Sequence, residues 1–250
     1  RAMLGGQRPS KEEDELSEIL RQYGTEHEAA YFEALKTHLQ TLNRNIVNLD
    51  SDRDQSAPYT VAALEERAKL TADKLADGPD AVYQPTFFSQ ENGIGWVGRA
   101  DFLVATDTPS DLGNYSFEPE DTKLARIAKV NAVLQLCSYA EHLTNMQGVE
   151  PEFIHVVTGS AKEGKVSIRL SEVSAYFRHV KEVLQNEVLN QFAGHSEPVP
   201  VENCTMCRWN KDCTRWWREH DHLSFVAGLQ NGHREALNAH GIFTLKEFAT

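Results

Sequence analysis

Apolar and polar positions change period along the chain, and each change predicts a different element. From residue 11 to residue 42, apolar residues recur at helical spacing with few breakers, and Gly24 is expected to divide this stretch into two helices. Residues 45–49 predict a short strand. Residues 59–76 predict a further helix, which ends before Gly78.

The middle of the chain has the shorter repeat of β-strands, separated by Gly, Asn, Pro and Asp turns. Strands are expected at 82–89, 95–105, 115–123, 153–158 and 165–170, and helices at 126–144 and 171–192, the last capped by Ser171. This order of helix, strands, helix, strands and helix predicts an α/β fold with a mixed central sheet flanked by helices.

Size and charge narrow the class of protein. The chain has 250 residues, 40% of them hydrophobic, which suits one α/β domain or a domain with a small module. Its net charge of -12 argues against a nonspecific basic nucleic-acid sleeve but permits an enzyme that binds cations. No run approaches the ~18 apolar residues of a membrane helix, and no export signal is visible, so we expect a cytoplasmic protein without membrane contact. Because the chain starts at Arg1, we expect a fragment.

Three charged residues in the predicted strands are candidates for chemistry. Asp101 is an acid within an otherwise apolar strand, and burial of a carboxylate is costly unless the carboxylate is paired or binds a metal. Asp121 and Lys123 are two residues apart, so they share one face of the next strand. The alternatives are an edge acid paired with Arg99 and an ordinary exposed ion pair.

Two helical motifs accompany these acids. Gln135 and Tyr139 are four residues apart and share a helix face directly after the Lys123 strand. His27 lies in helical sequence, where a histidine is more often a surface or core residue than a ligand. Alone, each motif is compatible with a purely structural role.

Taken in order, His27, Asp101, Asp-x-Lys at 121–123 and Gln-x-x-x-Tyr at 135–139 resemble the RecB-like branch of the PD-(D/E)XK nucleases, which includes CRISPR-associated exonucleases with iron–sulfur clusters. The resemblance covers about residues 20–215, and it departs from many relatives in having Asp rather than Glu at 121. It implies a restriction-endonuclease-like core and a DNA nuclease, with an exonuclease on single strands or ends favoured, alone or beside a helicase or other domain.

The resemblance also implies roles for these residues. His27, Asp101, Asp121 and the Thr122 carbonyl would bind Mg²⁺ or Mn²⁺, and Lys123 would position or activate a water. Glu26 would orient His27. The side chains expected to contact DNA are those of Arg99, Arg126, Gln135 and Tyr139.

Cysteines cluster near the C-terminus. Cys204, Cys207 and Cys213 have the spacing C-x2-C-x5-C, which favours a metal or cluster site over a disulfide framework. Cys137 is a poor fourth ligand because it points away from the face of Gln135 and Tyr139. Zinc completed by His220 or His222 is the alternative to the 4Fe-4S cluster that the resemblance implies, whose fourth ligand is expected before Arg1. The neighbouring tryptophans, which would pack there or stack on bases, are Trp209, Trp216 and Trp217.

The motifs predict three segments. Residues 1–200 would form the nuclease core, 201–225 the cysteine segment, and 226–250 a helical tail that resembles half of a helix-hairpin-helix module or a linker. The G-x-G-x-x-G match at 93–98 is expected to be a hairpin rather than a dinucleotide site, because strand sequence follows it. A catalytically silent nucleic-acid-binding module is the alternative function.

Overall fold

In the computed structural model, residues 15–50, 60–159, 164–190 and 198–250 are described, and they belong to two compact units. The larger unit comprises residues 20–191. The smaller unit comprises residues 1–19 and 192–250. No helix within the described ranges is long and apolar enough to cross a bilayer.

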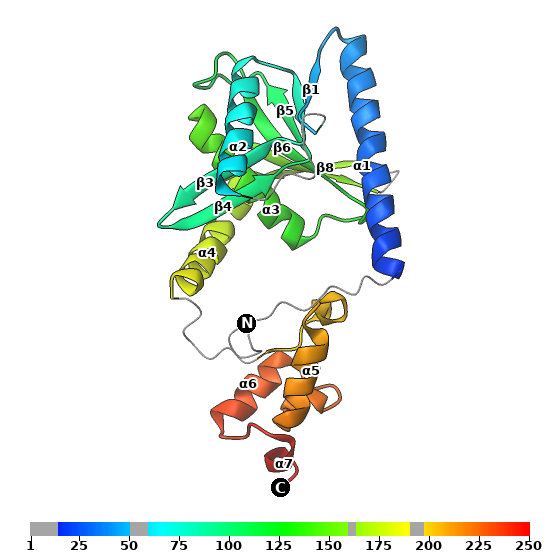
Figure 1. Cartoon of the computed structure of the whole chain (residues 1–250), viewed down its shortest axis with the longest axis vertical. Helices are drawn as coiled ribbons and strands as arrows, with labels where there is room; N and C mark the ends of the chain where they lie inside the picture. The colour runs from blue at the N-terminus through cyan, green and yellow to red at the C-terminus, as the bar shows by residue number, and fades with distance from the viewer. Residues whose placement is uncertain (1–14, 51–59, 160–163, 191–197) are drawn as a thin grey trace. The chain divides into compact units, whose positions relative to one another are not determined.

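The larger unit contains the predicted α/β fold (Figure 1). Its elements are α1 (Glu15–Thr41, from Leu20 onward in this unit), β1 (Ile46–Asn48), α2 (Val61–Ala76), β2 (Ala81–Tyr83), β3 (Thr86–Glu91), β4 (Ile94–Arg99), β5 (Phe102–Thr106), β6 (Ser116–Lys123), α3 (Val130–Gln147), β7 (Phe153–Thr158), β8 (Lys165–Arg169) and α4 (Leu170–Leu189). Six strands form a mixed sheet in the order β1-β2-β5-β6-β7-β8, with parallel β1–β2 and β6–β7 pairs. The predicted mixed sheet with flanking helices is confirmed.

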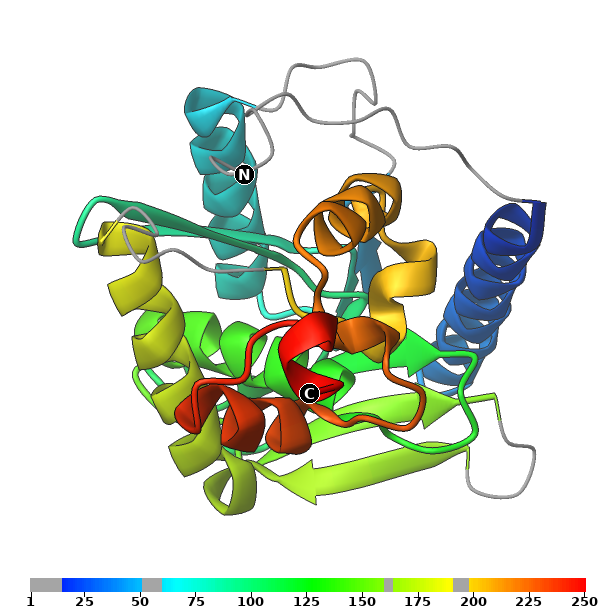
Figure 2. The ribbon, with the colours of Figure 1, turned by 90° about the horizontal axis from the view of Figure 1, so that it is seen from below.

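Helices cover both faces of this sheet. Val82, Leu103 and Phe117 turn one face toward α3 and join its Leu136 in the hydrophobic core. On the other face, the ring of Tyr31 in α1 meets Phe102 edge to face, and Phe32 packs on Tyr83. Figures 1 and 2 show α1 on its own side of the sheet, away from α2, α3 and α4.

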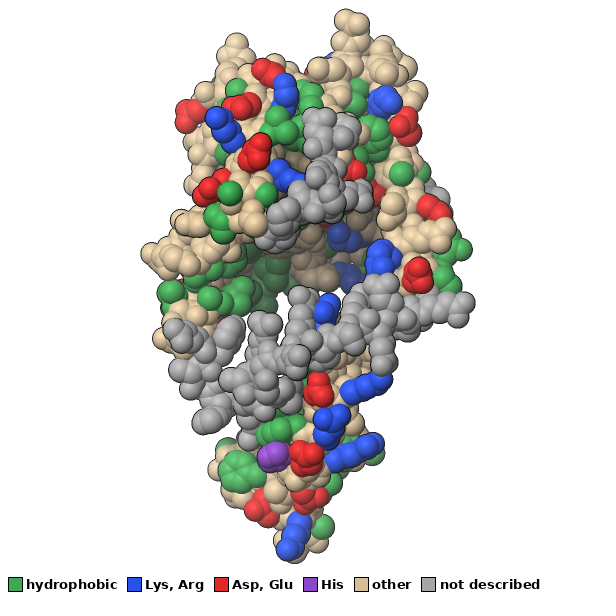
Figure 3. Space-filling view, in the orientation of Figure 1, with side chains coloured by type: hydrophobic (Ala, Val, Ile, Leu, Met, Phe, Trp, Pro, Cys, Tyr) green, Lys and Arg blue, Asp and Glu red, His purple; other side chains and the backbone are tan. Residues whose placement is uncertain are grey.

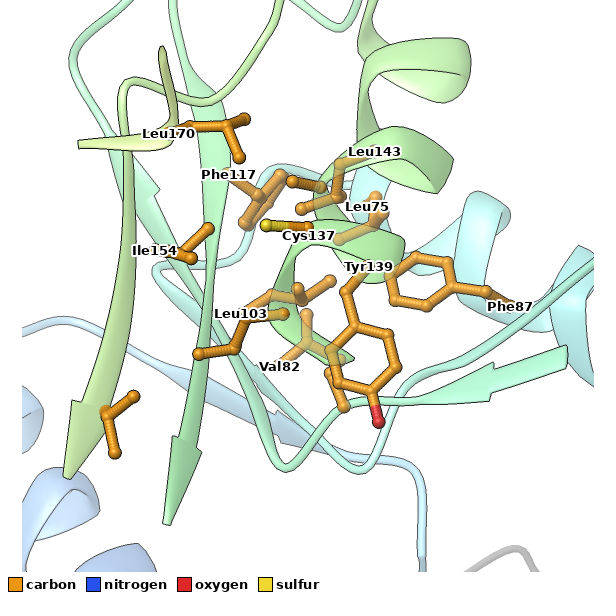
Figure 4. Close-up of a cluster of buried hydrophobic side chains, with 14 residues drawn as sticks. Leu75, Val82, Phe87, Leu103, Phe117, Cys137, Tyr139, Leu143, Ile154 and Leu170 are labelled. Atoms are coloured by element: carbon orange, nitrogen blue, oxygen red, sulfur yellow. The ribbon is translucent and has the colours of Figure 1, made fainter. Parts of the chain in front are cut away.

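The core explains the position of Cys137. Its side chain is buried among Phe117, Leu143 and Ile154 (Figure 4), and burial raises the pKa of its thiol to about 11. A thiol held neutral in a packed core is a poor metal ligand. Cys137 is therefore a structural residue.

Two predicted strands that pair with each other are both interrupted at the same point of their pairing. The expected strands 82–89 and 95–105 are each divided, into β2 and β3 and into β4 and β5. The pairs Tyr83–Phe102 and Thr86–Arg99 keep one register across the break, so the four strands form one hairpin that leaves the central sheet at a bend. The predicted position of Asp101 inside a strand was wrong: it lies in the bend. The predicted hairpin turn is confirmed at Gly93, between β3 and β4.

Three helix predictions are also corrected. Gly24 does not divide α1, which runs through it without a break. The helix expected at 126–144 begins later and ends later, at Val130–Gln147, because Gly148 terminates it with a left-handed backbone at φ 69°. Ser171 does not cap α4; the helix begins at Leu170, and Arg169 precedes it.

The smaller unit is helical. Its elements are η1 (Glu202–Met206), α5 (Asn210–Glu219), η2 (Leu223–Phe225), α6 (Asn231–Ala239) and α7 (Leu245–Phe248). Trp217 and Leu223 are its buried hydrophobic side chains among those described. Lys and Arg side chains gather on one side of this unit (Figure 3). The predicted helical tail is thus present as α6 and α7.

Candidate functional site

Asp101 and Asp121 lie opposite each other at the bend. The antiparallel register of β5 and β6 pairs Phe102 with Glu120. Asp101, which precedes Phe102, therefore lies opposite Asp121, which follows Glu120. Oδ2 of Asp101 accepts hydrogen bonds from the Thr122 backbone N–H at 2.7 Å and from its hydroxyl at 2.8 Å. The predicted adjacency of the two acidic strands is therefore confirmed, and Thr122 holds Asp101 against β6.

Asp121 is fully buried, as is its neighbour Glu120. The side chain of Asp121 is 1% exposed, and among the described residues no hydrogen-bond donor of acceptable geometry reaches either of its carboxylate oxygens. Burial, reinforced by the nearby charge of Asp101, raises the pKa of Asp121 to about 7. The ammonium group of Lys123, in ion-pair contact with Oδ2, opposes that rise. Two acids and one lysine thus share a site in which Asp121 is buried while Asp101 and Lys123 are partly exposed.

Gln135 and Tyr139 are brought to the same place from α3. The amide of Gln135 donates to the Tyr139 hydroxyl at 2.6 Å, and that hydroxyl donates to the Arg99 carbonyl at 2.6 Å. Burial raises the pKa of the Tyr139 hydroxyl, and the negative charges of Asp121 and Asp101 add to the rise. The predicted common face of Gln135 and Tyr139 is confirmed. In the structure, this face fastens the end of β4, while Figure 4 shows the Tyr139 hydroxyl turned away from the apolar cluster.

His27 lies on the side of α1 that meets the sheet. One turn before it, Gly24 lies beside Leu124, just past the end of β6, and one turn after it, Tyr31 hydrogen-bonds to Glu120. The Nε2 atom of His27 is buried and has no hydrogen-bond partner within the described residues. Glu26 does not orient this ring: it is exposed and accepts from Gln22 at 2.8 Å, so that expectation was wrong.

Glu28 and Gln84 were missed in the sequence. Glu28 accepts hydrogen bonds from the Tyr83 hydroxyl at 2.9 Å and from the Gln84 amide. Burial raises the pKa of Glu28, and the charge of Asp101 adds to the rise. Gln84 has a left-handed backbone at φ 56°, and its N–H donates to the Asp101 carbonyl at 2.8 Å. The signal in the sequence that could have identified Glu28 is its position next to His27. The proximity of Glu28 and Gln84 to Asp101 depends on the bend.

The donor set matches a hard cation in kind. Carboxylates and imidazole are ligands of Mg²⁺ and Mn²⁺, and the orphaned His27 Nε2 and Asp121 oxygens are buried polar atoms that a cation would satisfy. Nevertheless, the described parts of the chain contain no group of three or more His, Cys, Asp or Glu side chains already gathered around one point. Asp101 and Asp121 lie together, and among the described residues no third side chain of these types joins them.

The two arginines expected to contact DNA lie at different places. Arg99 is exposed at the end of β4 and lines a small cavity of about 30 Å³ with Arg67 and Gln84. Arg126 is exposed in the segment between β6 and α3. Both side chains are accessible to a polyanion, and Arg99 is next to the bend that carries Asp101.

The cysteine segment folds locally around η1 and the start of α5. The thiol of Cys204 accepts from the Val201 N–H at 3.2 Å, and the Cys207 N–H donates to the Cys204 carbonyl at 3.1 Å. Burial, with the neighbouring Cys207 and Cys204, raises the pKa of Cys213. The described residues nevertheless contain no group of three or more His, Cys, Asp or Glu side chains placed to bind a metal ion, and the three thiols are no exception.

The two histidines of the zinc alternative are both engaged. His220 stacks on Trp216 with ring centroids 4.1 Å apart, and its Nδ1 lies 2.9 Å from the Trp216 carbonyl. His222 is buried beside Trp217, and its Nδ1 accepts from the Ser224 N–H at 3.1 Å. These contacts occupy Nδ1 of each ring, so Nε2 is the atom that a metal would need.

A scan against models of protein families and a search of curated proteins found no match to this chain.

Proposed function

We propose that this protein is a metal-dependent nuclease that hydrolyses DNA phosphodiester bonds, with single strands or ends as the favoured substrate. The observation that carries the proposal is the juxtaposition of Asp101 and Asp121 across β5 and β6 with Lys123 in contact with Asp121. It agrees with the resemblance to RecB-like PD-(D/E)XK nucleases. Under this proposal, the sheet of the larger unit is a restriction-endonuclease-like core.

Under this proposal, the residues of the site have separate roles in metal binding and in catalysis. Asp101, Asp121 and His27 would hold Mg²⁺ or Mn²⁺, with the Thr122 carbonyl as a further oxygen donor. The ion would acidify a bound water and offset charge on the phosphate. Lys123 is 35% exposed, whereas Asp121 is 1% exposed, so the amine can meet the substrate while the carboxylate stays inside. Lys123 would orient the attacking water and stabilise the charge that develops on phosphate oxygens.

Tyr139, Gln135 and Glu28 would position these groups. The Gln135–Tyr139–Arg99 hydrogen bonds fix the end of β4, which is where the chain turns toward Asp101. Glu28 and Gln84 fasten the other strand of the bend to α1. Arg99 and Arg126 would attract the DNA backbone.

Substitution at the two strands tests the proposal. We expect Asp101→Asn and Lys123→Met to reduce Mg²⁺- or Mn²⁺-dependent cleavage of single-stranded DNA by at least about a hundredfold, because each removes a charge from the reaction centre. Cleavage is measured on labelled single- and double-stranded substrates. Far-UV circular dichroism of each variant shows whether it remains folded.

Asp107→Asn is the matched control, since Asp107 is an exposed acid just after β5. It should cleave at the wild-type rate. Undiminished cleavage by Asp101→Asn or Lys123→Met would contradict the proposal. DNA binding without cleavage in either metal would favour a catalytically silent binding module.

We further propose that Cys204, Cys207 and Cys213 hold an iron–sulfur cluster of the 4Fe-4S type with a fourth ligand from elsewhere. The C-x2-C-x5-C spacing of the three cysteines supports it, since such spacing is typical of metal and cluster sites. Zinc is the alternative occupant. The role would be structural, since a small helical unit has a limited apolar core.

A further inference from the structure

A cavity of about 420 Å³ lies within the smaller unit. Its walls come from the segment before η1, from η2 and from the start of α6. Val201, Leu223 and Leu229 supply apolar surface, while Ser224, Gln230 and Arg234 supply polar groups. Every lining residue belongs to this one unit, so the cavity does not depend on where the larger unit lies.

The side chain of Arg234 is the feature of this cavity that indicates a ligand. Its side chain lines the cavity, yet the residue is only 8% exposed. None of the described residues forms an ion pair or a side-chain hydrogen bond with it. A guanidinium on a largely buried side chain with no protein partner loses part of its hydration without compensation, which costs free energy. An anion in the cavity would supply the missing partner.

Ser224 provides a second, independent group. Its hydroxyl oxygen is buried and has no hydrogen-bond partner within the described chain, although the residue lines the same cavity. A hydroxyl and a guanidinium can both donate to one oxyanion. The Arg234 guanidinium and the Ser224 hydroxyl therefore both favour an oxyanion as the ligand.

The start of α6 lies at the same cavity. Gln230 precedes this helix of nine residues and lines the cavity with Asn231. The first N–H groups of a helix have no intrahelical acceptor and carry a partial positive charge, which favours an anion. Nor does any described lining residue carry a carboxylate. The charge of this cavity is thus positive in a protein whose net charge is -12.

We propose that this cavity is a phosphate-binding site, in which Arg234 and Ser224 donate to the phosphate oxygens and the start of α6 contributes its dipole. The apolar walls formed by Val201, Leu223 and Leu229 leave room for more than the anion itself. The phosphate belongs either to a free phosphate compound or to a nucleic-acid backbone. Part of the cavity wall, at the start of α6, belongs to residues 226–250, the tail that was expected to resemble half of a helix-hairpin-helix module.

The test measures phosphate binding to the whole chain without added divalent metal, so it does not depend on cleavage. Isothermal titration with inorganic phosphate is carried out at constant ionic strength against chloride. Wild-type protein should bind phosphate, and Arg234→Gln should weaken binding roughly tenfold or more, because a charge-assisted hydrogen bond is lost.

Lys246→Gln is the matched control. It removes the same charge from an exposed side chain in α7 of the same unit. It should bind phosphate as wild type does. Absence of phosphate binding by wild type, or equal weakening by Arg234→Gln and Lys246→Gln, would overturn the proposal.

Ser224→Ala keeps the test decisive if Arg234→Gln does not fold. It removes one buried oxygen without leaving a charge, and it should weaken phosphate binding roughly threefold to tenfold. Wild-type affinity in a folded Ser224→Ala protein would contradict the proposed contact.

Competition then identifies the source of the phosphate. A single-stranded oligonucleotide that displaces inorganic phosphate from wild type, but does not bind Arg234→Gln as tightly, indicates a nucleic-acid backbone. Displacement by a nucleoside monophosphate alone indicates a free phosphate compound. Either result supports the site, and both can be obtained whether or not the nuclease proposal holds.

Discussion

At Gly98, the backbone of β4 runs against the ring of Tyr139. A Cβ at this position would lie 2.8 Å from Cε1 and 2.9 Å from Cδ1 of that ring, closer than packed atoms allow. The hydroxyl of the same tyrosine donates a hydrogen bond to the Arg99 carbonyl, with the two oxygens 2.6 Å apart. A single absent methyl group thus permits the contact that fixes the end of β4 beside Asp101.

We therefore expect Gly98→Ala to lower the free energy of unfolding by about 1–3 kcal/mol, because the ring must move or the strand must bend. Cleavage should fall as well, since the displaced hydroxyl no longer fastens β4. Equilibrium unfolding in urea measures the first effect, and the DNA cleavage assay measures the second.

Gly95→Ala in the same strand is the control. Its Cβ would meet Cε2 of Phe88 at 3.4 Å, at the edge of ordinary contact. We expect a change in unfolding free energy within about 0.5 kcal/mol and no loss of cleavage. Equal effects of the two substitutions would show that the Tyr139 contact is unimportant.

At the scale of elements, α1 is joined to the sheet by a polar contact as well as by apolar packing. Tyr31 donates to Glu120, which is fully buried in β6 and is also paired with Lys165 of β8. The Tyr31 ring packs edge to face on Phe102, with centroids 5.2 Å apart. Because His27 lies one turn earlier, this contact positions the helix that carries it.

We expect Tyr31→Phe to lower the free energy of unfolding by about 1–3 kcal/mol, because it keeps the ring but leaves a buried carboxylate with one donor fewer. If His27 acts in the reaction, metal-dependent cleavage should fall too. Thermal and urea unfolding followed by circular dichroism measure the stability.

Tyr23→Phe provides the comparison on the same helix, since Tyr23 is 56% exposed. Loss of an exposed hydroxyl should change unfolding free energy by no more than about 0.5 kcal/mol. A Tyr31→Phe protein as stable as Tyr23→Phe would mean that Glu120 is satisfied without α1.

At the scale of the whole molecule, the two units differ in how they are stabilised. The larger unit has an extended apolar core between its sheet and helices, whereas Trp217 and Leu223 are the buried hydrophobic side chains described in the smaller unit. A small core usually needs a disulfide, metal or cluster to hold it. The proposed cluster at the three cysteines would serve this purpose.

We expect removal of the metal by a chelator to expose Trp217 and shift tryptophan emission to longer wavelength, while far-UV circular dichroism keeps the signal of the sheet. The absorption spectrum of anaerobically purified protein identifies the occupant: a broad brown shoulder indicates iron–sulfur, and a colourless protein with bound zinc indicates the alternative.

Cys213→Ser should lose the metal, whereas Cys137→Ser should retain it, because Cys137 lies in the core of the other unit. Unchanged metal content in Cys213→Ser would contradict the proposed ligand set. Emission that does not respond to the chelator would show that the metal has no structural role.

The sequence by itself determined most of the helices and strands and which nearby residues share a face. Alternating apolar residues predicted the strands, and two-residue spacing placed Asp121 and Lys123 on one face, because side chains alternate along any strand. Four-residue spacing likewise placed Gln135 and Tyr139 together on α3. These features depend on neighbours in the chain, so the sequence was sufficient for them.

Tertiary structure alone decided the rest of the candidate site. The bend that carries Asp101, the contact of Glu28 with Gln84, and the buried position of Arg234 each depend on segments that meet only after folding. Gly24 shows the same limit: a helix breaker by propensity, it lies within α1, which packs against the sheet. Local spacing records which residues share a face. Which faces become buried, and which polar atoms are left without partners there, depends on the packing of the whole fold.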